Sequence, residues 1–189
     1  ETSESFSRLQ AGFRKGRSCE DQILKITQAI ENGFMKKEFE RSLLVLLDYS
    51  AAFDKVWRQR LLETMLDQGI PQPIVRWIDC FLCNRQAKVR YGDNMSRIRT
   101  FSQGLLQGSV LSPLLFIIYI NNLAKELSDT DTVVMFADDV GILVTRREAK
   151  DAEVRAQELV DIVVKWSKKW KLTLNPIKSE VSTFTSLQT

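Results

Sequence analysis

Three aspartates give this chain the side chains for metal-assisted phosphoryl transfer. Asp48 follows the apolar run 43–47, which is typical of a buried strand, so its carboxylate needs a cation or a metal as partner. Asp138 and Asp139 lie between two strand-like runs, where a hairpin turn is expected. Mg²⁺ prefers carboxylate oxygens, and two ions can stabilise the attacking and leaving oxygens of an in-line displacement. The carboxylates therefore predict a two-metal site, provided that Asp48 and Asp138 converge across the 90 residues between them.

The Asp138–Asp139 pair also has a purely structural interpretation. Aspartate is common in turns because its side chain bonds nearby backbone groups. The position of the pair in the sequence therefore favours neither reading on its own.

Composition excludes several other chemistries. The chain has no histidine, which removes Ser-His-Asp and Cys-His catalysis and histidine-ligated zinc. Its three cysteines are an odd number, which argues against a disulfide framework and for a reducing compartment. Cys80 and Cys83 have C-x-x-C spacing, but they fall in a helical apolar pattern and no second pair of zinc ligands exists. We interpret them as ordinary thiols on a helix face.

Basic residues are clustered although the net charge is only +3, from 27 basic and 24 acidic residues. Separate basic clusters on a nearly neutral chain suit a phosphate backbone as partner, while solubilising surface charge is the alternative interpretation. The clusters comprise Arg14, Lys15 and Arg17; Arg85, Lys88, Arg90, Arg97 and Arg99; and Lys165, Lys168, Lys169, Lys171 and Lys178.

Length and composition indicate one globular domain or one large fragment. The chain has 189 residues, 44% of them hydrophobic and 27% charged, which excludes a wholly disordered chain. The longest apolar run, 114–120, is too short to cross a bilayer, and no secretory leader opens the sequence, so we expect no membrane partner.

Periodicity predicts the elements that must position the aspartates. Helical spacing indicates helices over 18–39, 58–68, 73–84, 112–126 and 147–170, with Ser18 and Ser112 as N-caps and Pro113 at the first helical position. Strands are expected over 42–48, 86–91, 96–101, 132–137, 140–145, 171–174 and 181–184. The second and third strands form one hairpin, and the fourth and fifth form another with Asp138 and Asp139 in its turn. The order predicts an α+β fold with a mostly antiparallel sheet backed by helices.

Five blocks in order resemble motifs of reverse transcriptases. LDYSAAFD (47–54), QGSVLSPLLF (107–116) and FADD (136–139) are similar to three successive motifs of that family. QAGFRKGRS (10–18) precedes them, and a block with Trp166, Trp170, Leu174, Asn175 and Lys178 follows. Together they resemble the non-LTR (LINE-like) retrotransposon branch.

The resemblance implies a right-hand polymerase palm with partial fingers and no thumb. Residues of about 41–57 and 104–189 would be palm, and about 1–40 and 58–103 would be fingers or palm-associated. The implied activity adds dNTPs to a DNA 3′-hydroxyl on an RNA template with two Mg²⁺ ions, for which Mn²⁺ is a possible substitute. The remaining fingers, thumb and endonuclease segments of the parent polyprotein would lie outside the chain, which alone would be weak or inactive. An intracellular location is implied, in the nucleus or a cytoplasmic ribonucleoprotein.

The resemblance also implies roles for individual residues. Asp48 and Asp138 would hold the metal ions and Asp139 would complete the acidic cluster. Phe53 would lie against the sugar and exclude a 2′-hydroxyl, although a core aromatic is its alternative interpretation. Lys178 would protonate the leaving pyrophosphate as a general acid.

Further roles concern the nucleotide and the template. Gln107 and Gly108 would lie along the incoming nucleotide and template strand, and Arg14 and Arg17 would contact template or nucleotide phosphate. Asp54 is expected to cap the helix that follows it.

Leu106 departs from the family pattern, which has proline directly before the Gln-Gly pair. Leucine frees φ and adds an N–H, so the loop could be less fixed. The alternative hypothesis is therefore a catalytically silent remnant, or a palm module that only binds nucleic acid. An RNA-templated RNA polymerase is a third option, which Phe53 disfavours.

Overall fold

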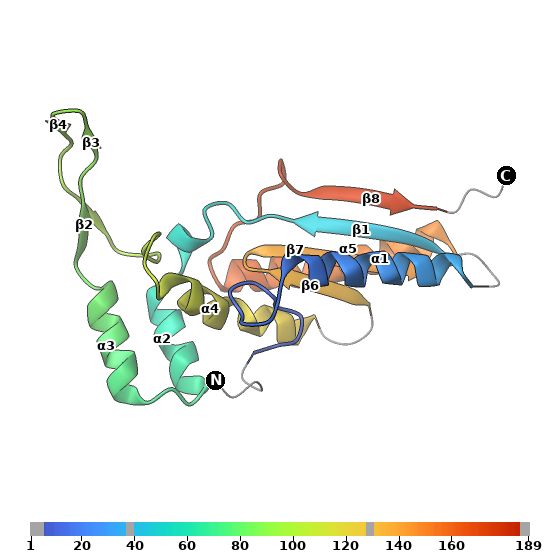
Figure 1. The fold of residues 1–189 in the computed structure, drawn as a ribbon, viewed down its shortest axis with the longest axis horizontal. Coiled ribbons are helices and arrows are strands. Elements are labelled where there is room, and N and C mark those ends of the chain that lie inside the picture. The colour runs from blue at the N-terminus through green and yellow to red at the C-terminus, as the bar shows by residue number, and fades with distance from the viewer. Residues whose placement is uncertain (1–5, 37–39, 128–130, 186–189) are drawn as a thin grey trace.

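A computed structural model describes residues 6–36, 40–127 and 131–185 (Figure 1). Its centre is a four-stranded antiparallel sheet in the order β6-β7-β1-β8. The strands are β1 (Arg41–Leu47), β6 (Thr132–Phe136), β7 (Asp139–Arg146) and β8 (Glu180–Phe184). The predicted α+β class and antiparallel sheet are confirmed.

Helices cover both faces of the sheet. Helix α5 (Ala149–Lys169) packs against β7 and β1, and α1 (Cys19–Phe34) packs on the opposite face, against β6, β7 and β1 (Figure 1). Alternation along β1 separates these contacts, because Val45 belongs to the large core cluster on the α5 side and Leu44 to a small cluster with Ile30 of α1. Helix α4 (Ser112–Glu126) is buried along most of its length and contacts α2 and α5.

The remaining elements form an extension at one end of the sheet. Helix α2 (Arg58–Asp67) and helix α3 (Gln72–Leu82) precede a β arm, which we define as residues 85–103. In the arm, β2 (Arg85–Ala87) pairs with β5 (Arg99–Phe101), and β3 (Arg90–Tyr91) pairs with β4 (Asn94–Met95). The arm projects away from the rest of the molecule, and residues 86–103 are all exposed (Figure 1).

Most predicted helices and strands are present within one to four residues, and Ser18 caps α1 through a capping box with Asp21. The part of the first predicted helix over 37–39 lies outside the described residues. Cys80 and Cys83 are exposed at the end of α3, as ordinary thiols. In the described part of the chain, no helix is long and apolar enough to cross a membrane.

Four local predictions were wrong. Helix α4 begins at Ser112 itself, because Leu111 already has helical backbone angles, so Ser112 is not the N-cap. Asp54 lies inside the short 3₁₀ helix η1 (Phe53–Lys55) and does not cap α2, whose N-cap Trp57 has no side-chain bond. Residues 171–174 contribute one isolated bridge, Tyr49 with Leu174, and no strand. The turn of the second hairpin is Ala137-Asp138, because Asp139 already pairs with Phe136.

Candidate active site

Strand register brings the distant aspartates together. Leu47, the last residue of β1, pairs with Val140 of β7. Asp48 therefore follows β1 at the end of the sheet where Ala137 and Asp138 connect β6 to β7 and where Asp139 begins β7. The expected convergence of Asp48 with the Asp138 pair is thus a consequence of antiparallel pairing.

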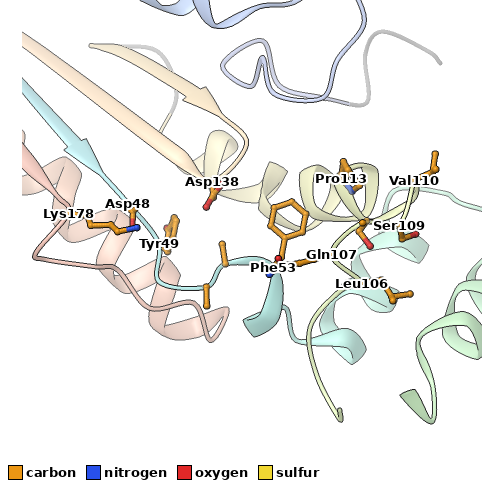
Figure 2. Close-up of a pocket in the computed structure, with 14 residues that line it drawn as sticks. Asp48, Tyr49, Phe53, Leu106, Gln107, Ser109, Val110, Pro113, Asp138 and Lys178 are labelled. Carbon is orange, nitrogen blue, oxygen red and sulfur yellow. The ribbon is translucent and has the colours of Figure 1, made fainter. Parts of the chain in front are cut away.

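A cavity of about 590 Å³ lies at this end of the sheet, where β1 ends and β7 begins (Figure 2). Figure 2 shows Asp48 and Lys178 at one end, Val110 and Leu106 toward the other, and Asp138, Phe53 and Gln107 between them. The cavity brings together six of the nine predicted site residues, namely Asp48, Phe53, Gln107, Gly108, Asp138 and Lys178. Asp139 lines a neighbouring cavity of about 330 Å³, which Asp48 and Lys178 also line.

Burial and neighbouring carboxylates both destabilise the charged forms of Asp138 and Asp139. Burial raises the pKa of the Asp138 carboxyl, and the charge of Asp48 raises it further, while the positive charge of Lys178 acts in the opposite direction. Burial likewise raises the pKa of Asp139, to which Asp138 and Asp48 both add. The positive charge of Lys178 therefore does not balance the negative charge of the three aspartates at this end of the sheet.

The donor set fits a divalent metal completed by substrate oxygens. Asp48 Oδ1 is buried and lacks a hydrogen-bond partner among the described residues. In the described part of the chain, no three acidic or thiol groups are gathered closely enough to hold a metal alone. Mg²⁺ is usually bound by one or two carboxylates together with substrate phosphates, so Asp48 and Asp138 fit this pattern.

Phe53 is both a core aromatic and a wall of the cavity. Its ring stacks on Phe116 of α4, with ring centroids 4.5 Å apart, and meets the ring of Phe13 edge-on at 6.3 Å. Packing against α4 thus fixes a ring that also lines the cavity, and its contact with the sugar stays a prediction.

The loop with Gln107 and Gly108 is tied to η1. Gln107 Nε2 donates to Asp54 Oδ1 at 3.0 Å, and the amide of Leu105 donates to the Phe53 carbonyl at 2.8 Å. Gly108 has a φ of +87°, a conformation that favours glycine. Leu106, at the position of the family's proline, lines the cavity within this tethered loop.

Lys178 lies in a turn that is bonded to Asp48. The Asn175 amide donates to the Asp48 carbonyl at 2.8 Å, and the Asp48 amide donates to Ser179 Oγ at 3.4 Å. These two bonds hold the turn beside the end of β1, and Lys178 itself is exposed.

Arg14 and Arg17 lie apart from the described cavity lining. Arg14 Nη1 donates to the carbonyls of Ser7 and Gln10, at 2.7 and 3.1 Å. Arg17 is exposed. Their contacts with template or nucleotide phosphate stay predictions.

Sequence reasoning missed two contributors to this site. Tyr49 lines the cavity, and burial raises its pKa to about 12 although Ser167 Oγ shares a hydrogen bond with its hydroxyl at 2.8 Å. The position of Tyr49 directly after Asp48 in the sequence could have indicated that it belongs to the site. Gln10 is wholly buried against the Ala137-Asp138 turn, and its signal was its place in the 10–18 block.

Comparison with known proteins shows the family to which the chain belongs. The model of the reverse transcriptase (RNA-dependent DNA polymerase) family matches residues 1–188. A probable RNA-directed DNA polymerase from transposon BS of Drosophila melanogaster is 31% identical over 182 residues, covering 93% of this chain and 20% of the relative. Another, from the X-element of the same organism, is 30% identical over 179 residues, covering 93% and 19%.

A solved structure shares the fold. Telomerase from Candida tropicalis, truncated from its C-terminal domain, aligns with a TM-score of 0.69 at 13% identity, covering 96% of this chain and 37% of that one. The chain belongs to the reverse transcriptase family, and its fold is that of a right-hand polymerase. Its relatives are polymerases of non-LTR retrotransposons, so the predicted branch is confirmed. The chain spans about a fifth of the length of the curated relatives it matches.

Proposed function

We propose that this chain is the catalytic core of an RNA-directed DNA polymerase of a non-LTR retrotransposon. It adds dNTPs to a DNA 3′-hydroxyl on an RNA template. The observation that supports this most is the single cavity lined by Asp48, Asp138, Phe53 and Lys178, which come from distant parts of the sequence. We assign about 41–57 and 104–189 to the palm, and about 1–40 and 58–103 to fingers or palm-associated segments.

Divalent metal use is general in the family. We infer two Mg²⁺ ions here, with Mn²⁺ as substitute, held by Asp48 and Asp138, while Asp139 completes the acidic cluster. When bound, such ions neutralise charge at the attacking and leaving oxygens. The orphaned Oδ1 of Asp48 and the raised pKa of Asp138 both support a cation at this place.

Other side chains position the nucleotide and move a proton. The ring of Phe53, which stacks on Phe116, lies against the sugar and excludes a 2′-hydroxyl. Gln107 and Gly108 lie along the nucleotide and template strand, and Lys178 gives a proton to the leaving pyrophosphate. Arg14 and Arg17 contact template or nucleotide phosphate.

The partners follow from the activity. They are an RNA template, a DNA primer, dNTPs and the rest of the polymerase. A structural neighbour, telomerase from Candida albicans, is in complex with a fragment of telomeric RNA, which supports an RNA partner here. We place the protein in the nucleus or a cytoplasmic ribonucleoprotein.

Primer extension tests this proposal in the polymerase that contains the chain. Asp138→Asn removes a charged ligand at nearly constant volume, and Asp67→Asn at the exposed end of α2 is the matched control. We expect extension to fall by about 10³-fold or more in Asp138→Asn, because positioning and charge neutralisation carry most of phosphoryl-transfer catalysis. Activity within a few-fold of the Asp67→Asn control contradicts the proposal.

A second candidate is a module that binds nucleic acid without catalysis. The exposed β arm favours it, because five basic residues lie in 85–99 with one acidic residue, Asp93. Such a module binds RNA in a salt-sensitive manner. If the chain is such a module, adding Mg²⁺ should not change its resistance to proteolysis. If it is a metal-binding palm, Mg²⁺ should make it more resistant.

A further inference from the structure

The hairpin turn that carries Asp138 is held by a segment from the other end of the chain. Strand β6 is an edge strand, and residues 9–11 run beside it. The Met135 amide donates to the Leu9 carbonyl, and the Ala11 amide donates to the Met135 carbonyl, both at 2.9 Å. These bonds bring Gln10 to the position from which its side chain reaches the turn.

The side-chain amide of Gln10 binds both backbone groups of Ala137, the residue before Asp138. Gln10 Oε1 accepts from the Ala137 amide at 2.8 Å, and Gln10 Nε2 donates to the Ala137 carbonyl at 2.9 Å. Gln10 is fully buried. Ala137 has a φ of +56°, a left-handed conformation that a non-glycine residue keeps only when its surroundings enforce it.

Gly12 contacts the side-chain amide of Gln10, and Arg14 contacts its main chain. The Gly12 amide donates to the same Gln10 Oε1 at 2.8 Å, and Arg14 Nη1 donates to the Gln10 carbonyl at 3.1 Å. A Cβ on Gly12 would lie 2.2 Å from the Ala137 nitrogen, so only glycine allows this close approach. The side-chain oxygen of Gln10 is therefore held by Gly12, and the main chain of Gln10 is held by Arg14.

We propose that Gln10 is a positioning residue for polymerisation. Its amide fixes the peptide groups on both sides of Ala137, and because peptide groups are planar this sets the direction in which the Asp138 side chain leaves the backbone. The distance between the Asp138 and Asp48 carboxylates, and with it their joint affinity for a divalent cation, depends on this contact. The inference rests on the proposed function.

Substitutions of Gln10 separate hydrogen bonding from volume. Gln10→Met keeps the approximate volume and loses both bonds to Ala137. Gln10→Glu keeps an acceptor for the Ala137 amide but places a second oxygen against the Ala137 carbonyl, so we expect an intermediate effect. Gln68→Met is the matched control, because Gln68 at the end of α2 has an Nε2 that is buried and has no hydrogen-bond partner in the described part of the chain.

The experiment uses the whole polymerase and two independent readouts. Mn²⁺ affinity is measured by electron paramagnetic resonance without nucleotide, and kcat and KM for dNTP are measured by primer extension. We expect Gln10→Met to weaken Mn²⁺ binding and lower kcat by about 10- to 100-fold each, as for other residues that orient metal ligands. KM for dNTP and RNA affinity stay near those of Gln68→Met, because the nucleotide and template contacts are untouched.

Two further measurements apply if Gln10→Met does not fold. Gly12→Ala pushes the turn sterically while leaving the amide in place, and we expect the same weakening of Mn²⁺ binding. In the unmodified protein, the Ala137 amide should exchange with solvent slowly although it lies in a turn. Fast exchange of that amide, or Mn²⁺ affinity in folded variants equal to that of Gln68→Met, overturns the inference.

The readouts also distinguish this inference from the proposed function. If the unmodified polymerase fails to extend primers but its Mn²⁺ affinity depends on Gln10, the proposed function fails and the positioning role stands. If it extends primers and the Gln10 variants match the control in both affinity and kcat, the positioning role fails alone.

Discussion

The backbone of Asp48 and that of Asn175 are joined by a hydrogen bond of 2.8 Å, from the Asn175 amide to the Asp48 carbonyl. This bond connects Asp48, the proposed metal ligand that follows β1, to the turn that presents Lys178. The backbones that carry the Asp48 carboxylate and the Lys178 ammonium group are therefore attached to each other, although the Lys178 side chain is exposed.

This attachment leads to a prediction for Lys178. We expect Lys178→Ala to lower kcat for primer extension by about 10²-fold, the lower end of the effect of a general acid, with KM for dNTP nearly unchanged. Lys178→Arg should be almost as slow, because a guanidinium gives up its proton far less readily. Lys169→Ala, on the exposed end of α5, is the control, and equal rates for the Lys178→Ala and Lys169→Ala enzymes contradict the role.

The ring of Phe53 should control sugar selection. Phe53→Val opens space beside the sugar position, so discrimination against ribonucleotides, measured as the ratio of kcat/KM for dNTP and rNTP, should fall about 10- to 100-fold. The variant also loses the stacking on Phe116, so the melting temperature is measured alongside. Phe101→Val in the β arm is the control, and an unchanged ratio in a folded Phe53→Val enzyme argues that Phe53 acts only in packing.

The acidic cluster should destabilise the metal-free protein at neutral pH. The pKa values of Asp138 and Asp139 are raised above the ordinary value of 3.8, so their contribution to stability is present below that pH and is lost as pH rises through the raised values. We therefore expect Asp138→Asn to raise the melting temperature in EDTA at pH 7 by a few degrees.

Two conditions check this explanation of the stability change. The difference should narrow as the pH falls through the raised pKa of Asp138, because protonation then removes the charge at residue 138 in the unmodified protein. Saturating Mg²⁺ should stabilise the unmodified protein more than the variant, because binding to the native state adds stability. A variant that melts below the unmodified protein in EDTA would show that the carboxylate has a stabilising partner.

The β arm should contribute to RNA affinity through charge. Arg97→Ala should weaken RNA binding and lower the slope of log affinity against log salt by about one, with little dependence on RNA sequence. Filter binding across a salt series measures this slope. Lys150→Ala, on the exposed first turn of α5, is the control, and identical slopes for both variants would show that the arm does not touch the phosphate backbone.

Elements with a strong apolar period were predictable from the sequence, and the details at their ends were not. The run 43–47 and the hairpin around Asp138 are set by local pattern, so β1, β6 and β7 matched. The turn was misplaced by one residue, because a positive φ at Ala137 carries no local signal and is enforced by Gln10 from 127 residues away. Ser112 is not the N-cap because Leu111 already has helical backbone angles, in a turn where the amides of Leu111 and Ser112 both bond to Ser109.

The site residues divide in the same way. Asp48 and Asp138 could be proposed from their positions at the ends of apolar runs, but their convergence depends on the pairing of Leu47 with Val140. Register of this kind follows from the whole sheet. The double role of Phe53, in the core and at the cavity, likewise needed the position of Phe116 on α4.

The central place of β1 in the sheet has a consequence for biosynthesis. Asp48 and Ser179 are 131 residues apart, so at about 5–20 residues per second the ribosome needs roughly 7–26 s to make the second partner after the first. Strand β1 lacks both sheet neighbours until β7 (Asp139–Arg146) is made, and β8 (Glu180–Phe184) follows only after residue 179. Translation that stops before residue 138 therefore leaves Asp48 without the two carboxylates that β7 pairing brings beside it.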